Sequence, residues 1–289
     1  TPLVGLLGGG NEVLGFRLTI VLFAVLSVAI FWFTFATTRE RTRLKPHTAT
    51  IGEDFSALAK NISWIVLVAT GIVIVVGLVA RFASIVFYIK YYVQDTGDAL
   101  FWIFDKTAVL TSIGLIGQLI GALITPMLSA RFEKHHLIIG VNVLHAVLLG
   151  ICFFVPPDQF ALIVLVHSLG ILTFGVTITL LFSMYTDCAE YGEWNTGKNT
   201  AGLTVSASMF SLKFGSAVGG ALPGFVLAGF GFVANAAQTD QAIVGIRLMF
   251  NVLPAIFFLA GGMLMFLYKI DRHTLSRIEA ELHERRGTG

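Results

Sequence analysis

Long apolar runs separated by short polar turns dominate the chain. A membrane-spanning helix needs about 20 mostly apolar residues, and seven stretches of the sequence meet this requirement. The runs do not alternate between apolar and polar positions, and they are too long for β-strands. The sequence therefore predicts an all-α polytopic membrane protein with seven transmembrane helices. The predicted helices cover residues 17–38, 62–93, 102–129, 136–155, 160–185, 201–233 and 244–268.

Prolines and glycines punctuate these runs. Several runs are longer than a bilayer requires, so we expect helices that tilt or kink. Pro223 and Pro254 lie inside apolar runs and are the positions at which kinks are expected, because proline breaks one helical hydrogen bond. Small residues four positions apart let helices approach closely. Such glycine pairs occur at Gly117 and Gly121, Gly215 and Gly219, and Gly220 and Gly224.

The composition supports a membrane protein. Of the 289 residues, 56% are hydrophobic and 12% are charged, and the charged share is about half that of a soluble globular protein. The formal net charge of +2 gives no reason to expect a nucleic-acid partner. The two cysteines, Cys152 and Cys188, lack the spacing of a disulfide framework or a zinc site.

Basic residues concentrate in every second turn between the predicted helices. Lys and Arg number five in residues 39–60, two in 131–136, one in 186–200 and five in 269–289, and none in 94–100, 156–159 or 234–243. Basic loops of membrane proteins stay in the cytoplasm. We therefore expect the basic segments and the C-terminus to be cytoplasmic.

The long basic connector divides the chain. Residues 1–38 hold the end of one helix and a complete second helix, 39–61 form a cytoplasmic connector, 62–268 form a bundle of six helices, and 269–289 form a cytoplasmic tail. The chain has no initiator Met and opens on an apolar stretch, so we expect an N-terminally truncated piece of a longer protein. A six-helix block after a basic loop is typical of the second half of a transporter.

Lys213 is the most informative charge within the predicted helices. It lies twelve residues into its helix, which at 1.5 Å per residue places it about 18 Å deep, near the bilayer midplane. Ionisable groups at this depth are costly and usually face a cavity. Ser206 and Gly220, seven residues to either side, make that face small and polar. We predict a functional role for Lys213; the alternative is a structural pair with a carboxylate.

Arg81 is the second such charge, and Ser84 and Tyr88 follow it on the same helical face. An arginine fork suits a carboxylate, and an aromatic ring suits a sugar ring. We predict that Arg81 and Tyr88 face a substrate; the alternative is that Arg81 extends to the outer surface. The single histidines, His145 and His167, are predicted to be hydrogen-bonded interior groups.

The stretch YTDCAEYGEWNTG, residues 185–197, places three carboxylates at the cytoplasmic end of a predicted helix. They are Asp187, Glu190 and Glu193. At this spacing they drift around a helix and do not converge on a metal or an acid/base site. The asparagine and glycine that follow break the helix. We predict that the acids pair with basic groups, such as Arg131 or those of residues 39–45, and hold an inner gate shut.

Several stretches resemble the family of glycoside–pentoside–hexuronide cation symporters. The family pattern of an acid, two residues, a second acid, then Tyr-Gly-Glu and an aromatic is matched by Asp187, Glu190, Tyr191, Gly192, Glu193 and Trp194. MFSLKFGSAVGG, residues 209–220, resembles the family's next helix with its embedded lysine at Lys213. The other similar stretches are TRER (38–41), FYIKYYVQDTG (87–97) and GFVANAAQTDQAIVGIR (231–247), the last most similar to the glucuronide carriers. The resemblance covers essentially the whole chain, from the end of the family's fifth helix to the C-terminus.

The resemblance implies a major-facilitator fold whose C-terminal half is formed by the last six helices. It implies uptake of a sugar or glycoside, weakly favouring a glucuronide, coupled to Na⁺, Li⁺ or H⁺. The coupling cation would bind to preceding helices of the same protein. The protein would lie in the lipid bilayer of a bacterial cytoplasmic membrane. No covalent cofactor is implied. The substrate-side residues implied in this half are Lys213, Ile178 and Thr179. Ile178 departs from the family, which often has tryptophan or another larger residue in this region.

Two other classes of membrane protein fit parts of the sequence. A seven-helix receptor or photoreceptor would share the number of helices, but a retinal protein places a lysine in its last helix and residues 248–268 contain none. A visible absorbance band on mixing with retinal would reveal this class. A membrane enzyme would need convergent reactive groups, and the sequence has no GxSxG, HExxH, Walker A or dinucleotide-binding motif. We therefore expect no enzymatic activity and no catalytic residues.

Overall fold

The computed structural model describes residues 2–38, 58–95, 98, 100, 104–197 and 201–287. The chain forms two compact units. The smaller unit holds residues 1–48 and 97–109, and the larger unit holds residues 49–96 and 110–289. The connector predicted at residues 39–61 lies outside the described residues except for 58–61.

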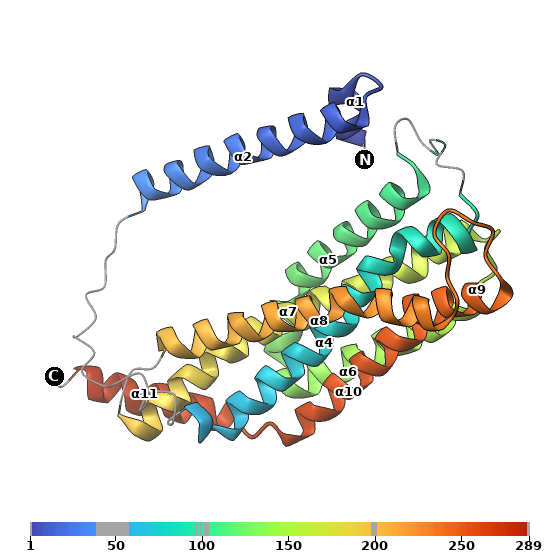
Figure 1. Ribbon diagram of the computed structural model, residues 1–289. Helices are drawn as coiled ribbons and strands as arrows, with labels where there is room; N and C mark the ends of the chain where they lie inside the picture. The colour runs from blue at the N-terminus through green and yellow to red at the C-terminus, as the bar shows by residue number, and fades with distance from the viewer. Residues whose placement is uncertain are drawn as a thin grey trace. The chain divides into compact units, whose positions relative to one another are not determined.

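In the smaller unit a tight turn joins α1 (Pro2–Gly8) to α2 (Glu12–Thr37), as Figure 1 shows. Gly9 and Gly10 adopt φ angles of 53° and 95°, which glycine reaches without strain. The Asn11 side chain accepts a hydrogen bond from the first turn of α2 and caps that helix. Along α2 most side chains are apolar, and almost all residues are exposed within this unit. A helix of this kind needs lipid or further helices around it.

The larger unit consists of helices (Figure 1). Their bounds are α4 Ile62–Phe87, α5 Lys106–Arg131, α6 Lys134–Phe154, α7 Phe160–Thr196, α8 Ala201–Gly229, α9 Asp240–Arg247, α10 Leu253–Leu264 and α11 Arg272–Gly287. The first residues of α5 belong to the smaller unit. Two π-helical segments extend the spans: η1 (Tyr88–Tyr92) continues α4, and η2 (Leu248–Val252) joins α9 to α10. A 3₁₀ turn, η3 (Met265–Leu267), ends α10.

Among the described residues, seven helices are long and apolar enough to cross a membrane. This confirms the seven helices predicted from the apolar runs. The largest difference is at α7, which continues past the predicted end at residue 185 to Thr196. Its last turns are polar but helix-compatible, and Gly197 ends the helix with φ 68° while its N–H donates to the Glu193 carbonyl at 2.8 Å. The helix break predicted at NTG is therefore confirmed.

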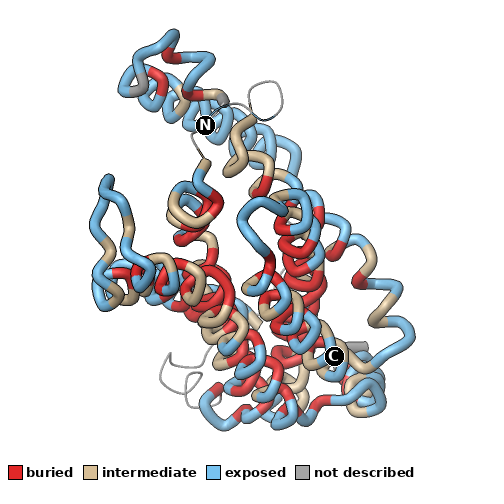
Figure 2. Tube along the Cα trace, turned by 90° about the vertical axis from the view of Figure 1, so that its right-hand side faces the viewer, coloured by how far each residue is buried: buried red, intermediate tan, exposed pale blue. Residues whose placement is uncertain are grey.

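Each helix of the larger unit buries one side against neighbouring helices. α4 packs against α8 and α10, and α6 packs against α7 and α10. One core cluster between them contains Ile74, Leu149 and Phe258. Figure 2 shows the buried residues gathered where neighbouring helices face each other. Because lipid tails are as apolar as such a core, the association depends on close packing more than on the hydrophobic effect.

Glycine brings α5 and α7 into backbone contact. A Cβ atom added at Gly121 would overlap the Leu172 carbonyl oxygen, and one added at Gly175 would overlap the Gln118 carbonyl oxygen. Only a residue without a side chain fits at such positions. The packing role predicted for Gly121 is confirmed.

The glycines of α8 behave differently from one another. Gly215 and Gly219 lie against the backbone of α4, where an added Cβ would come within 2.9 Å and 2.6 Å of carbonyl oxygens, as their spacing predicts. Gly224 has no neighbour within 4 Å, and Gly220 meets only a side-chain carbon at 4.0 Å. Within the larger unit, Gly220 and Gly224 therefore do not make the close contact that their spacing predicts.

We expect Gly121→Ala to lower the thermal unfolding temperature of the detergent-solubilised protein. The added methyl group would overlap the α7 backbone, which cannot move as a flexible side chain can. Overpacking of this kind costs roughly 1–3 kcal/mol. Gly150→Ala is the matched control, because Gly150 lies within α6 and has nothing within 4 Å of an added Cβ. Equal unfolding temperatures for the two variants would contradict the close α5–α7 contact.

Candidate functional site

Arg81 is enclosed within the larger unit. Its side chain is 1% exposed and extends from α4 toward η2 and α7. Nη1 donates to the Phe250 carbonyl and to Asn251 Oδ1, the latter at 3.4 Å, and Nη2 lies 3.0 Å from His167 Nδ1. The guanidinium carbon also lies 3.9 Å from the centre of the Phe250 ring, in cation–π geometry. Arg81 therefore links three helices.

Proline explains why Phe250 offers its carbonyl to Arg81. In an α-helix this carbonyl would accept a hydrogen bond from the N–H of the residue four positions later. That residue is Pro254, which has no N–H. The π-helical segment η2 covers Phe250, and Arg81 supplies the missing donor. The kink expected at Pro254 is thus realised as a local change of helix type with an arginine as its partner.

A second arginine follows the same rule. Arg247 donates from Nη2 to the carbonyl of Phe153 near the end of α6. The residue four positions after Phe153 is Pro157, which cannot donate. The Arg247 guanidinium also lies 4.9 Å from the Tyr92 ring and 4.4 Å from the Phe153 ring. Both arginines thus satisfy carbonyls without an intrahelical donor, that of Phe250 because of Pro254 and that of Phe153 because α6 ends at Phe154.

The two predicted interior histidines are buried, with exposed fractions of 1% and 2%. A guanidinium only donates, so His167 accepts from Arg81 at Nδ1 and, as a neutral ring, carries its hydrogen on Nε2. His145 Nδ1 lies 2.9 Å from Thr173 Oγ1, and its ring stacks on Phe258 at 3.8 Å between centres. The prediction of hydrogen-bonded interior groups is confirmed for both.

Tyr88 lies beside Arg81 in the same enclosed region. It is fully buried, and its ring stacks on that of Phe250 with 4.1 Å between centres. Neither Tyr88 nor Arg81 is open to solvent in this arrangement. The substrate contact predicted for them stays a prediction, and it requires α4 and η2 to separate.

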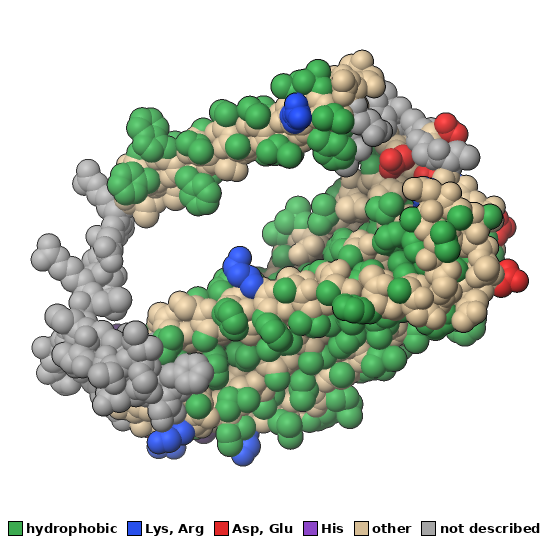
Figure 3. Space-filling view, in the orientation of Figure 1, with side chains coloured by type: hydrophobic (Ala, Val, Ile, Leu, Met, Phe, Trp, Pro, Cys, Tyr) green, Lys and Arg blue, Asp and Glu red, His purple; other side chains and the backbone are tan. Residues whose placement is uncertain are grey.

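Lys213, unlike Arg81 and Tyr88, lies on an exposed surface of the larger unit. It is exposed on α8 within the larger unit and makes no hydrogen bond or ion pair with any described residue. Its neighbours Phe210 and Phe214 are 70% and 52% exposed, so it stands on an apolar face. Figure 3 shows how sparse basic side chains are on the apolar surface of the helices. A lysine of this kind at bilayer depth needs a polar environment that other helices or a cavity supply.

Ile178 and Thr179, the other predicted substrate-side residues, lie in the middle of α7 and are half-buried. Thr179 Oγ1 donates to the Gly175 carbonyl at 2.9 Å and keeps its lone pairs for a further donor. Ile178 packs against two core clusters. Of this pair, Thr179 therefore has the group that can bind a hydroxyl.

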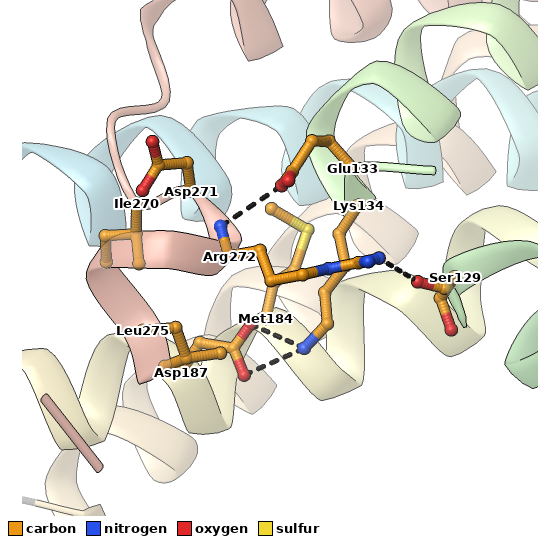
Figure 4. A pocket seen from close by; sticks show the side chains of 9 residues that line it. All are labelled: Ser129, Glu133, Lys134, Met184, Asp187, Ile270, Asp271, Arg272 and Leu275. Carbon is orange, nitrogen blue, oxygen red and sulfur yellow. Dashed lines mark hydrogen bonds and ion pairs between the residues drawn. The ribbon is translucent and has the colours of Figure 1, made fainter. Parts of the chain in front are cut away.

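Near the C-terminal end of α7, Asp187 pairs with Lys134 at the start of α6. Lys134 Nζ lies 2.7 Å and 3.0 Å from the two carboxylate oxygens (Figure 4). It also donates to Ser183 Oγ at 2.9 Å. The Asp187 side chain is 12% exposed. The sequence predicted Arg131 or residues 39–45 as partners. Arg131 is exposed and is not the partner in this structure, and residues 39–45 lie outside the described residues. Lys134 belongs to the same basic turn as Arg131 and is the first residue of α6.

Arg272, which opens α11, encloses the pocket around this pair (Figure 4). Its guanidinium donates to the carbonyls of Ser129, Ala130 and Phe132 at 2.6–3.2 Å, and its N–H donates to Glu133 Oε2 at 3.2 Å. The carbonyls of Ser129 and Ala130 lie in the last turn of α5 and that of Phe132 directly follows it, so a cation there also meets the negative end of the helix dipole. No sequence pattern predicts this contact, because the tail is far from α5 along the chain.

The helix α11 is held against the C-terminal end of α7. Trp194 Nε1 donates to Glu281 Oε2 at 2.7 Å, and Ile278 and Leu282 are buried. Hydrogen bonds from the Thr274 hydroxyl and amide lower the pKa of Asp271, the residue that caps α11. The tail after residue 269 is thus a docked helix, where the sequence predicted only a cytoplasmic tail.

The remaining residues of the acidic stretch lie between these contacts. Glu190, Tyr191, Gly192 and Glu193 are half-buried on α7. The Tyr191 ring lies 6.0 Å from that of Trp194 and packs against a core cluster. This end of α7 is therefore part of the packed structure of the larger unit.

Known proteins match the chain over almost its full length. The profile of the family described as MFS/sugar transport protein matches residues 1–272. The chain is 30% identical to the inner membrane symporter YicJ of Escherichia coli K12, over 97% of the chain and 60% of that protein. It is 29% identical to the glucuronide carrier protein homolog of the same organism, over 93% of the chain and 57% of that protein.

A relative from another bacterium agrees with these. The chain is 28% identical to the isoprimeverose transporter of Lactiplantibacillus pentosus, over 94% of the chain and 56% of that protein. The chain thus spans 56–60% of the length of these three relatives.

Proposed function

Because the chain belongs to the MFS/sugar transport protein family, we propose that the protein containing it is a cation-coupled symporter of a glycoside, pentoside or hexuronide. The relatives are named as symporters, carriers and transporters, among them ones for a glucuronide and for isoprimeverose. The structural observation that carries the proposal is Lys213, an exposed cation in the middle of an apolar helix with no described partner. A sugar cavity between two helical bundles would give this group its polar environment.

The proposed mechanism is alternating access. Binding of Na⁺ or H⁺ and of sugar stabilises an occluded state, and the bundles rock around a site near the midplane. The cation site is expected in family helices that this chain does not include. Lys213 would orient the acids of that site or attract a sugar carboxylate. Thr179 and Ile178 would contact the sugar, and Arg81 and Tyr88 would reach it only in a state in which α4 and η2 are apart.

The seven apolar helices make this a multi-pass membrane protein. We propose the bacterial cytoplasmic membrane as its location, with the C-terminus in the cytoplasm. The alternation of turns with and without Lys and Arg supports this orientation, and one relative is named as an inner membrane symporter.

Uptake by cells carrying the intact gene tests the proposed function. Labelled glucuronide, xyloside and galactoside would be offered with and without Na⁺, and with and without a protonophore. We expect accumulation of at least one of them that collapses when its driving cation gradient is removed. A glucuronide is favoured by the similarity of residues 231–247. Absence of accumulation, or uptake that depends on neither the Na⁺ nor the H⁺ gradient, would refute coupled symport.

We expect Asp187→Asn to slow sugar uptake. The change leaves Lys134 without its carboxylate and loosens the cytoplasmic ends of α6 and α7. The ion pair is partly exposed, so its loss should cost roughly 1–3 kcal/mol, between the values of surface and buried pairs. Initial uptake rates and the inward/outward ratio, measured by accessibility of single engineered cysteines, check this prediction.

Two control variants sharpen the Asp187 test. Exchanging the charges, Lys134→Asp with Asp187→Lys, should restore part of the uptake if the pair itself matters. Arg131→Ala should have a much smaller effect, because Arg131 is exposed at the end of α5. A loss in Arg131→Ala equal to that in Asp187→Asn would favour the pairing predicted from the sequence over the one in the structure.

A further inference from the structure

Gln118 lies in the middle of α5. From Lys106 at the start of this helix to Gln118 there are twelve steps of 1.5 Å, which is about 18 Å of helix. Thirteen further residues lead to Arg131 at its end. An amide side chain therefore stands at the depth of the bilayer midplane.

The backbone of Gln118 is fixed while its amide is free. Its carbonyl lies against Gly175 of α7, and Gly117 and Gly121 close the same contact one residue before and one turn after. The side chain is half-buried, and its amide makes no hydrogen bond with any described residue. The helix contact thus holds Gln118 at one place without satisfying its polar group.

An amide in this position needs a polar partner. An amide in hydrocarbon without hydrogen bonds is strongly disfavoured, so polar groups at this depth face the protein interior or a cavity. Two other helices of the larger unit carry polar groups at a similar depth. Thr179 lies one turn after Gly175 on α7, and Lys213 lies twelve residues into α8. The polar layer at the midplane therefore spans α5, α7 and α8.

We propose that Gln118 binds a hydroxyl group of the transported sugar and contributes to its selection. This inference rests on the proposed symport function. A glutamine amide offers one acceptor oxygen and two N–H donors, which suits a sugar hydroxyl that both donates and accepts. Lys213 offers only donors, and the Thr179 hydroxyl already donates to its own helix. Gln118 is uncharged and recognises the position of a hydroxyl irrespective of whether the sugar carries a carboxylate.

The test compares wild type with Gln118→Met, which keeps the unbranched shape and removes the amide. KM and maximal uptake rate are measured for the best substrate and for its series of monodeoxy analogues. Loss of one neutral hydrogen bond corresponds to a rise in KM of roughly 2- to 12-fold. For Gln118→Met we expect this rise in KM for the parent sugar and little change in maximal rate. One analogue lacks the hydroxyl bound by Gln118, and for it the KM of the variant should rise no further than for the parent sugar. Gln118→Glu, which retains an acceptor, should recover part of the affinity.

The outcomes separate this inference from the proposed function. If wild type accumulates no sugar, the symport proposal fails, and the assignment of Gln118 fails with it. If wild type transports and Gln118→Met keeps the wild-type penalties for every analogue, Gln118 does not bind the sugar. A lower maximal rate with unchanged analogue preference would place the amide in helix packing and overturn the inference. Failure of both variants to reach the membrane would overturn it in the same way.

Discussion

Lys213→Ala is expected to abolish uphill sugar accumulation in cells that carry the intact gene. The substitution removes the one basic side chain of α8, which stands exposed near the middle of that helix. If it orients the cation-site acids or attracts the substrate, its loss uncouples the cation gradient from the sugar. Sugar would then equilibrate across the membrane at most. Intracellular and external concentrations of labelled sugar at steady state check this prediction.

Two lysine variants serve as controls for Lys213. Lys213→Arg keeps the charge and should retain measurable accumulation, although the two cations differ in shape and hydration. Lys269→Ala removes an exposed lysine outside the membrane-spanning helices and should leave accumulation unchanged. Wild-type accumulation by Lys213→Ala would show that this lysine takes no part in coupling.

Arg81→Ala is expected to prevent stable folding of the larger unit. The change leaves the Phe250 carbonyl, Asn251 Oδ1 and His167 Nδ1 without their donor and removes the stacking on Phe250. Each buried acceptor left unpaired costs roughly 1–3 kcal/mol, and the truncated side chain leaves a cavity. The amount of protein in the membrane and its thermal unfolding temperature are the measurements. Uptake of charged and uncharged glycosides should fall together.

Arg277→Ala is the matched control for Arg81. Arg277 is exposed and forms a surface pair with Glu281 four residues later, so its removal should cost no more than about 1 kcal/mol. A different outcome would support the sequence-based role of Arg81. If Arg81→Ala folds normally, keeps uncharged glycosides and loses only glucuronide affinity, then Arg81 recognises a carboxylate in a state other than this one.

The sequence was sufficient to predict the spans because bilayer thickness imposes a length on apolar runs. It was less reliable for α7, since the amino acids of the acidic stretch favour helix but do not belong in hydrocarbon. Hydropathy places the predicted end at residue 185, whereas the helix continues to Thr196. The apolar length of a segment and its helical length are separate properties. Only Gly197 marks the end of the helix.

Polar partners were harder to predict than helices. The sequence predicts that the acids pair with Arg131 or with basic groups of residues 39–45, the latter outside the described residues. In the structure Asp187 pairs with Lys134, because the turn into α6 brings Lys134 over the face of α7 that carries Asp187. Arg272 joins the same region from the tail. The amide of Gln118 was missed as well, since a single glutamine in an apolar run carries no motif. A search for lone amides at midplane depth would have found it.

Taken alone, the sequence determined the number of helices, the basic side of the membrane and the family pattern in the acidic stretch. It identified Lys213 and Arg81 as cations within apolar helices and predicted that both face a substrate cavity. The tertiary structure distinguished them. Pro254 leaves a carbonyl free, and η2 and α7 enclose Arg81 around it, whereas Gly215 and Gly219 turn α8 so that Lys213 remains on the open side. Helical periodicity tells which residues share a face, but only contacts between distant segments decide which face is covered.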